Sequence, residues 1–130
     1  MKILQPEGWP RPKGYANGIS ASGRMVFTAG VIGWNEQEVI TSHRIQDQFA
    51  QALTNVVAIL AEDGAKPEHI VRLTIYVTSI QEYLPVRDDL VPIWKSIMGD
   101  HYPAVALVEV VRLVERAAKV EIEATAVVPE

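Results

Sequence analysis

The chain has 130 residues, of which 48% are apolar and 22% charged, and its formal net charge is −4. This length and composition are typical of a single globular domain, which we expect over residues 1–130 with residues 1–13 as an extended lead-in. The absence of cysteine excludes disulfides, thiolate nucleophiles and cysteine-based metal sites, and the scattered basic residues argue against nucleic acid as a partner. No stretch has the apolar length of a secretion signal or a membrane span, so we expect a cytoplasmic protein without a membrane partner.

The N-terminal part of the chain is predicted to be extended. Three prolines within residues 5–13 disfavour a helix there. Residues 18–30 are predicted to form a β-hairpin, with its turn at Ser22–Gly23 and a strand at Met25–Thr28. A break or bulge is expected after this strand, at Gly30 and Gly33.

Two later segments have helical periodicity. Residues 42–61 carry apolar side chains at spacings of three and four, with Thr41 or Ser42 as the N-terminal cap and Gly64 just past the end. The second helix is expected to begin with the capping box Ser79–Glu82 and to be kinked at Pro92. Its apolar face includes Trp94, which we expect in the core.

Alternating residues predict strands over residues 70–78 and 119–127, and a short run that is apolar apart from Glu109 predicts another over residues 105–110. In the first of these, Val71, Leu73, Ile75 and Val77 are expected on one face, and Arg72, Thr74 and Tyr76 on the other. The order β-β-α-β-α-β-β predicts an α+β fold with a mixed sheet and both helices packed on one of its faces. The other face stays partly apolar, which favours an oligomer whose boundary lies near four charged residues, Arg72, Glu109, Glu121 and Glu123.

The order and spacing of several segments resemble the RidA/YjgF family, also called the endoribonuclease L-PSP or translation initiation inhibitor family. These segments are Gly14-Tyr15, Val26 to Gly30, Gln51 to Val56, Ile70 to Thr78, Tyr102-Pro103-Ala104 and Val120 to Ala124. The resemblance covers residues 14–127. It implies a chorismate-mutase-like fold, a homotrimer with ligand clefts between subunits, and hydrolysis of reactive enamines and imines to a carbonyl compound and ammonia, without a cofactor.

The same resemblance assigns candidate site residues. Tyr15 matches the family's cleft tyrosine, Gly30 the glycine at a strand end, and Glu121 the glutamate that positions water. The arginine that clamps the substrate carboxylate follows Pro-Ala in the family, and here that position is Val105. Valine cannot make the bidentate contact of an arginine. Two further departures are Arg87, where the family has an asparagine, and Ala29, where it has a small hydroxyl residue.

Several of these residues have two readings. Arg87 is either a solvated helix residue beside Asp88 and Asp89 or a replacement for the missing clamp, for which Arg72 and Arg112 are weaker candidates. Tyr15 either contacts ligand or closes the sheet edge. Two loop tryptophans, Trp9 and Trp34, either cover a neighbouring subunit or line the pocket. Glu123 is expected to be structural.

Residues 8–18, together with Gly33-Trp34, are similar to a branch of the family labelled 2-aminomuconate deaminase. We therefore predict a cofactor-independent deaminase of a small enamine or imine, with Glu121 and Tyr15 catalytic and with Gly30, Arg87, Val105 and Trp34 in contact with substrate. The three histidines lack metal-ligand spacing, so no metal is expected. One alternative is a trimeric small-molecule-binding or protein-interaction module without turnover. A further alternative, a pericyclic enzyme like chorismate mutase, is supported by fold analogy alone.

Overall fold

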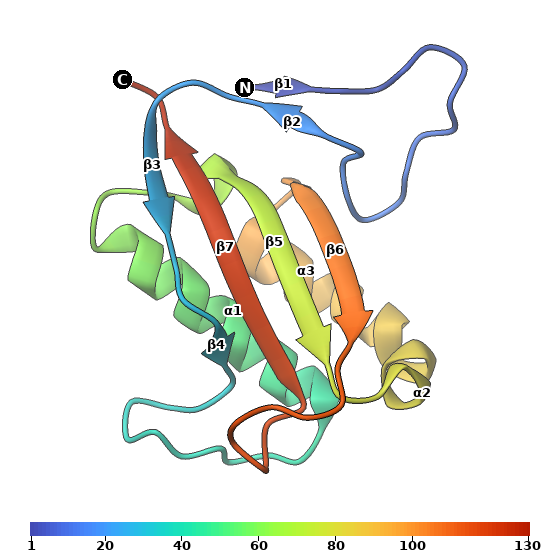
Figure 1. Ribbon diagram of the computed structural model, residues 1–130, viewed down its shortest axis with the longest axis vertical. Coiled ribbons are helices and arrows are strands. Elements are labelled where there is room, and N and C mark those ends of the chain that lie inside the picture. Colours follow the sequence, from blue (N-terminus) through green and yellow to red (C-terminus); the bar gives the residue numbers. More distant parts are fainter.

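A computed structural model describes all 130 residues and has a five-stranded mixed sheet at its centre (Figure 1). The strands follow the order β3-β7-β5-β6, and the short β4 also pairs with β7. β5 and β6 are parallel, and the other pairs are antiparallel. The strands are β3 (Arg24–Phe27), β4 (Val31–Ile32), β5 (Ile70–Val77), β6 (Ala104–Glu109) and β7 (Val120–Val128).

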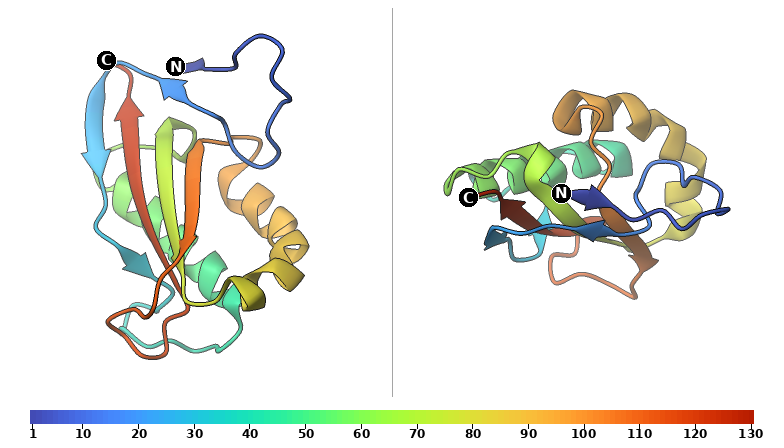
Figure 2. Two further views of the ribbon diagram at one scale, coloured as in Figure 1. Left: turned by 45° about the vertical axis from the view of Figure 1, so that its right-hand side comes forward. Right: turned by 90° about the horizontal axis from the view of Figure 1, so that it is seen from above.

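The helices cover one face of this sheet and leave the other face open, as predicted (Figures 1 and 2). The longest, α1 (Ile45–Ala61), lies behind β7, and α3 (Leu90–Met98) packs beside it. The shorter helical segments are η1 (Pro67–His69), α2 (Ile80–Tyr83) and η2 (Leu84–Asp89). The α+β fold with a mixed sheet is thereby confirmed. None of the helices combines the length and apolar character that a membrane span requires.

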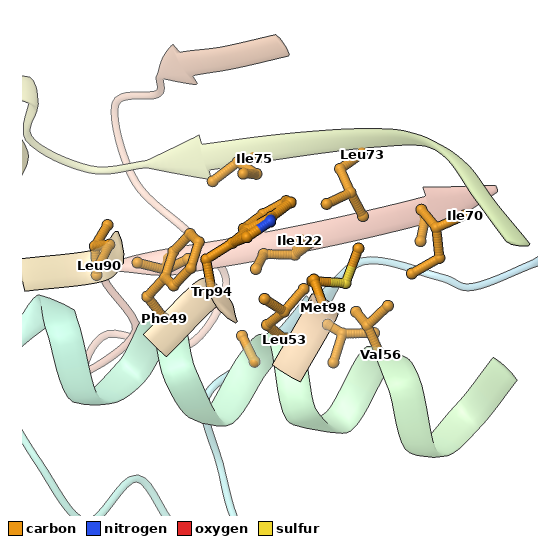
Figure 3. Packing of buried hydrophobic residues seen from close by; sticks show 14 of the residues in the cluster. Phe49, Leu53, Val56, Ile70, Leu73, Ile75, Leu90, Trp94, Met98 and Ile122 are labelled. Atoms are coloured by element: carbon orange, nitrogen blue, oxygen red, sulfur yellow. The ribbon is translucent and has the colours of Figure 1, made fainter. Parts of the chain in front are cut away.

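The core is one cluster of 19 buried residues between the helices and the sheet. Leu53 and Val56 of α1 and Ile122 of β7 belong to this cluster, and all three are fully buried (Figure 3). Burying each such side chain contributes about 1.5–3 kcal/mol of folding free energy. Trp94 of α3 joins this core as predicted; its ring stacks on Tyr102, and its indole N–H donates to the carbonyl of His101 over 3.0 Å.

α1 begins at Ile45, three residues after the predicted start, and its N-cap residue Arg44 makes no side-chain cap. Ser42 instead stabilises the approach to the helix: its hydroxyl accepts the Arg44 N–H and donates to Asp47 over 2.7 Å. Beyond the C-terminus Gly64 has a φ of +78°, a left-handed conformation that glycine adopts without strain. The predicted end of this helix is therefore confirmed.

The second helical segment begins as predicted but is interrupted earlier. The Ser79 hydroxyl accepts the Glu82 N–H over 3.1 Å, as a cap should. The break is the 3₁₀ segment η2 and not Pro92, where the kink was expected. Pro92 is the third residue of α3, within the first turn, where an N–H has no partner inside the helix.

The predicted hairpin over residues 18–30 is wrong. β2 (Ile19–Ser20) pairs with β1 (Lys2–Ile3), whereas β3 pairs with the C-terminal strand, Arg24 lying opposite Val128. Gly23 has a φ of +147°, and a Cβ there would lie 2.1 Å from the Val128 carbonyl oxygen. The glycine therefore permits close approach of two distant strands and does not form a hairpin turn.

β5 has the predicted inward residues from Leu73 onward, but its first residues differ. A register irregularity between Ile70 and Arg72 turns Ile70 fully into the core and leaves Val71 half-buried. Arg72 is exposed on the open face, where Thr74 and Tyr76 follow it. A bulge of this kind inverts the alternation locally, which the sequence pattern alone does not reveal.

Candidate functional site

A cleft of about 730 Å³ opens beside the edge strand β6, between η2, α3 and the segment that follows the N-terminal lead-in. It brings together three of the predicted site residues, Tyr15, Arg87 and Val105. The remaining lining residues are mostly apolar: Lys13, Gly14, Phe49, Ile75, Tyr83, Asp88, Leu90, Val91, Trp94, Tyr102 and Leu107. This volume is that of a small-molecule site.

Backbone contacts hold Tyr15 at the mouth of this cleft. The next residue, Ala16, is buried, forms a parallel bridge with Ala104 and donates its N–H to the Pro103 carbonyl over 2.9 Å. The Tyr15 side chain itself is 43% exposed. The Tyr-Pro-Ala segment and the Gly-Tyr pair, which the sequence placed far apart, thus meet at one point of the sheet edge.

The rim of the cleft carries two cations and one carboxylate. The cations are Lys13, two residues before Tyr15 in the chain, and Arg87 of η2, and the carboxylate is that of Asp88, also of η2. Burial raises the pKa of the Tyr83 hydroxyl, and the charge of Arg87 opposes that rise, so the guanidinium lies near this ring. Sequence reasoning missed Lys13, although its position two residues before Tyr15 was a usable signal.

Gly30 and Glu121 lie together on the open face of the sheet. β4 pairs with β7 so that Ile32 is opposite Glu121, and the chain just before β4 passes over the carboxylate. A Cβ on Gly30 would lie 2.7 Å from Cδ and from Oε2 of Glu121. The predicted glycine therefore leaves the space that this carboxylate occupies.

Two side chains without a predicted role fix the segments around Gly30. The Thr28 hydroxyl accepts the Ala124 N–H over 3.0 Å and donates to the Ala29 carbonyl over 2.8 Å. The Asn55 amide of α1 donates to two carbonyls on the other side, those of Ile32 and Trp34, over 3.1 and 2.8 Å. Both side chains lie within segments that the resemblance singled out, but all their partners except Ala29 are distant in sequence.

Gln48 is a buried polar side chain with three backbone partners. Its amide donates to the carbonyls of Ser42 and Ala117, each over 2.9 Å, and its carbonyl accepts the Lys119 N–H over 2.7 Å. Only 1% of the residue is exposed. These bonds tie the start of α1 to the chain just before β7 and so help to set where Glu121 lies.

The other polar residues of the sheet have separate partners. The Tyr76 hydroxyl donates to Glu123 over 2.6 Å, and this hydrogen bond raises the pKa of the tyrosine. Glu123 also borders a small hollow of about 240 Å³ with Arg72. Glu109 is not on this face: its carboxylate accepts the Ile80 N–H at the start of α2. Arg112 is exposed in the loop before β7, outside the cleft.

The predicted site residues fall into two groups on opposite faces of the sheet. Val105 is in register with Leu73, whose side chain points to the helices. Glu121 is in register with Tyr76, on the open face. Glu121, Gly30 and Trp34 do not line the cleft. Within one chain, the carboxylate and the cleft therefore do not form a single site.

No group of three or more histidine, aspartate and glutamate side chains is placed to hold a metal ion. The arrangement therefore offers a mostly apolar cleft with charged groups at its mouth, and a separate carboxylate, that of Glu121, beside Gly30.

Comparison with known proteins identifies the family. The model of the family described as Endoribonuclease L-PSP matches residues 10–128. The chain belongs to this family, the RidA/YjgF family. A relative from Escherichia coli, named putative reactive intermediate deaminase TdcF, is 32% identical over 97% of this chain and 96% of its own length. A 2-iminobutanoate/2-iminopropanoate deaminase from Salmonella typhimurium is also 32% identical, over 97% of this chain and 97% of its own length.

Solved structures of the family share the fold. The crystal structure of E. coli TdcF with bound serine is 30% identical, with a TM-score of 0.71 over 98% of this chain and 99% of that chain. Named members of the family thus include imine deaminases, and one structural relative holds a small amino acid.

Proposed function

We propose that this protein is a cofactor-independent deaminase that hydrolyses a small enamine or imine to an oxo compound and ammonia. The names of its relatives support this activity. The observation that carries the proposal is the meeting of Tyr15, Arg87 and Val105 in one cleft large enough for such a substrate. The protein acts as one domain over its 130 residues, in the cytoplasm.

We further propose that the site is completed by a second copy within a homotrimer. The support is geometric: the cleft opens on the helix side of the sheet edge, while Glu121 and Gly30 lie on the open face. That face also exposes Met25 and Phe27, which are 58% and 62% exposed in the single chain. Apolar side chains so exposed favour association, and association brings the Glu121 of one copy to the cleft of the next.

In this mechanism the substrate supplies its own activated C=N bond, so the protein needs only to position water. Glu121 accepts a proton from water as the water oxygen bonds to the imine carbon, and the C=N electron pair moves to nitrogen. The nitrogen takes up the proton that Glu121 accepted, which gives the neutral carbinolamine. Glu121 then removes the hydroxyl proton and returns it to nitrogen as the C=O bond forms, the C–N bond breaks and ammonia leaves. Tyr15 at the mouth hydrogen-bonds the substrate, and the backbone near Gly30 stabilises charge that develops there.

The test is ammonia release above buffer alone, from imines generated by an amino-acid oxidase and from 2-aminomuconate, the substrate class of the branch that residues 8–18 resemble. We expect faster release with at least one of these substrates and loss of it in Glu121→Gln. Glu68→Gln, which changes an exposed carboxylate outside the cleft, is the matched control. Light scattering on the same samples measures the oligomer. Release no faster than buffer with every substrate contradicts the deaminase.

A binding or interaction module without turnover is the second candidate, and Val105 is the observation that favours it. Restoring the family's residue separates the two functions. If Val105→Arg releases ammonia while the wild-type protein does not, the wild-type protein is the binding module. If the wild-type protein already turns over imines, the module is ruled out.

A further inference from the structure

The floor of the cleft is unsuited to a carboxylate. This floor consists of buried and half-buried lining residues, and none of them is a cation: Val105, Leu107, Ile75, Phe49 and Trp94. A carboxylate placed on this floor would lose its water without gaining a charged partner, which is strongly unfavourable. An apolar group would instead bury its surface against the same side chains.

The cations of the cleft lie at its rim. Lys13 and Arg87 are both exposed and line the cleft from different segments. The ion pairs of the structure join Arg24 to Asp63, Arg44 to Asp47 and Lys119 to Glu82, so neither rim cation is paired. Asp88 also lines the rim and reduces its positive charge. Within a single chain, one net positive charge therefore remains at the mouth to attract an anion.

We infer that the cleft selects carboxylates with a branched or aromatic body: the apolar group lies on the Val105 floor, and the carboxylate lies at the rim near Lys13 and Arg87. For imine substrates this inference rests on the proposed function, because the selectivity then determines which imino acids the enzyme hydrolyses. The binding mode itself does not depend on turnover and is measurable with the corresponding oxo acids.

The test is calorimetric titration with 2-oxopropanoate and with 2-oxo-3-phenylpropanoate. We expect the aromatic acid to bind at least about tenfold more tightly, because its ring buries several carbons on the floor. Lys13→Ala and Arg87→Ala should each weaken the binding of the aromatic acid about two- to fivefold, the scale of exposed charge pairs. Asp88→Asn should strengthen its binding by about the same factor. Lys95→Ala removes an exposed α3 cation outside the cleft and should change nothing.

Val105→Arg supplies the reciprocal test, since a cation on the floor should favour 2-oxopropanoate and weaken the aromatic acid. Equal affinity of the wild-type protein for both acids, or unchanged affinity in both rim variants, overturns the inference. The result is separable from the proposed function. Selective binding without ammonia release refutes the deaminase alone, whereas ammonia release with no selectivity for aromatic acids refutes the inference alone.

Discussion

Gly30→Ala is expected to reduce turnover with little effect on folding. The added Cβ would lie 2.7 Å from Cδ and Oε2 of Glu121 and 3.2 Å from its Cγ. These atoms are the end of a flexible side chain, so the carboxylate rotates away and the backbone stays in place. The rotamer change costs about 0.5–1.5 kcal/mol. A displacement of a reacting group by about 1 Å, however, lowers rates on the order of 100-fold.

Gly33→Ala is the matched control, because it adds the same methyl group three residues later. Its Cβ would lie 2.4 Å from the Gln48 carbonyl oxygen and 2.8 Å from the Gln48 Cα. These are backbone atoms within α1, which cannot move aside without shifting the helix. We expect this substitution to destabilise the fold by about 1–3 kcal/mol or more, the cost of overpacking.

The two variants are compared by urea unfolding and by ammonia release per folded protein. The expected result is a nearly unchanged unfolding midpoint with a large loss of turnover in Gly30→Ala, and a lowered midpoint in Gly33→Ala. Full turnover in Gly30→Ala would refute the role given to Glu121, since its carboxylate cannot keep its position beside an alanine. A large loss of stability in Gly30→Ala would show that the backbone is less tolerant than the contacts indicate.

Three further outcomes are expected. Gln48→Ala removes three hydrogen bonds to backbone groups, at about 1 kcal/mol each, and should lower the free energy of unfolding by about 3 kcal/mol, measured in urea; an unchanged midpoint would contradict this. Asn55→Ala removes the donor to two carbonyls and should cost about 1–3 kcal/mol, with hydrogen exchange increased in the segment after β4. Tyr76 and Tyr83 should both ionise above the ordinary tyrosine pKa in an ultraviolet titration; Tyr76→Phe should remove one of these ionisations, and Glu123→Gln should lower the pKa of Tyr76. Because the pKa of Tyr76 is raised in the fold, the stabilisation from its hydrogen bond to Glu123 is complete below the tyrosine pKa of the unfolded chain and is lost as the pH rises through the pKa of the folded protein. No change in the titration of these variants would contradict this prediction.

Long periodic segments were predictable from sequence, and non-local pairings were not. α1 and β7 follow from their spacing because each buries one regular face. The hairpin at residues 18–30 failed because a turn signal is local, whereas β3 finds its partner at the other end of the chain. The bulge after Ile70 has no sequence signature, since it depends on how β5 meets its neighbours.

For the candidate site, residue types were predictable, but their grouping was not. The resemblance selected Tyr15, Gly30 and Glu121 by motif, and the structure places Gly30 against Glu121. The alternation of residues within each strand does not reveal that Val105 of β6 and Glu121 of β7 lie on opposite faces of the sheet. Their relative orientation depends on how both strands pair with β5, which lies between them. Lys13 lies two residues before Tyr15 in sequence, but whether its side chain reaches the cleft depends on the tertiary packing of the lead-in.

The most direct test of a deaminase site shared between copies is complementation of two inactive variants. Tyr15→Ala disables the cleft and Glu121→Gln disables the carboxylate, so each homo-oligomer should be inactive. Random mixing during co-refolding pairs an intact cleft with an intact carboxylate at about one quarter of the sites. The account therefore predicts recovery of about a quarter of wild-type ammonia release. No recovery from well-mixed oligomers would contradict it.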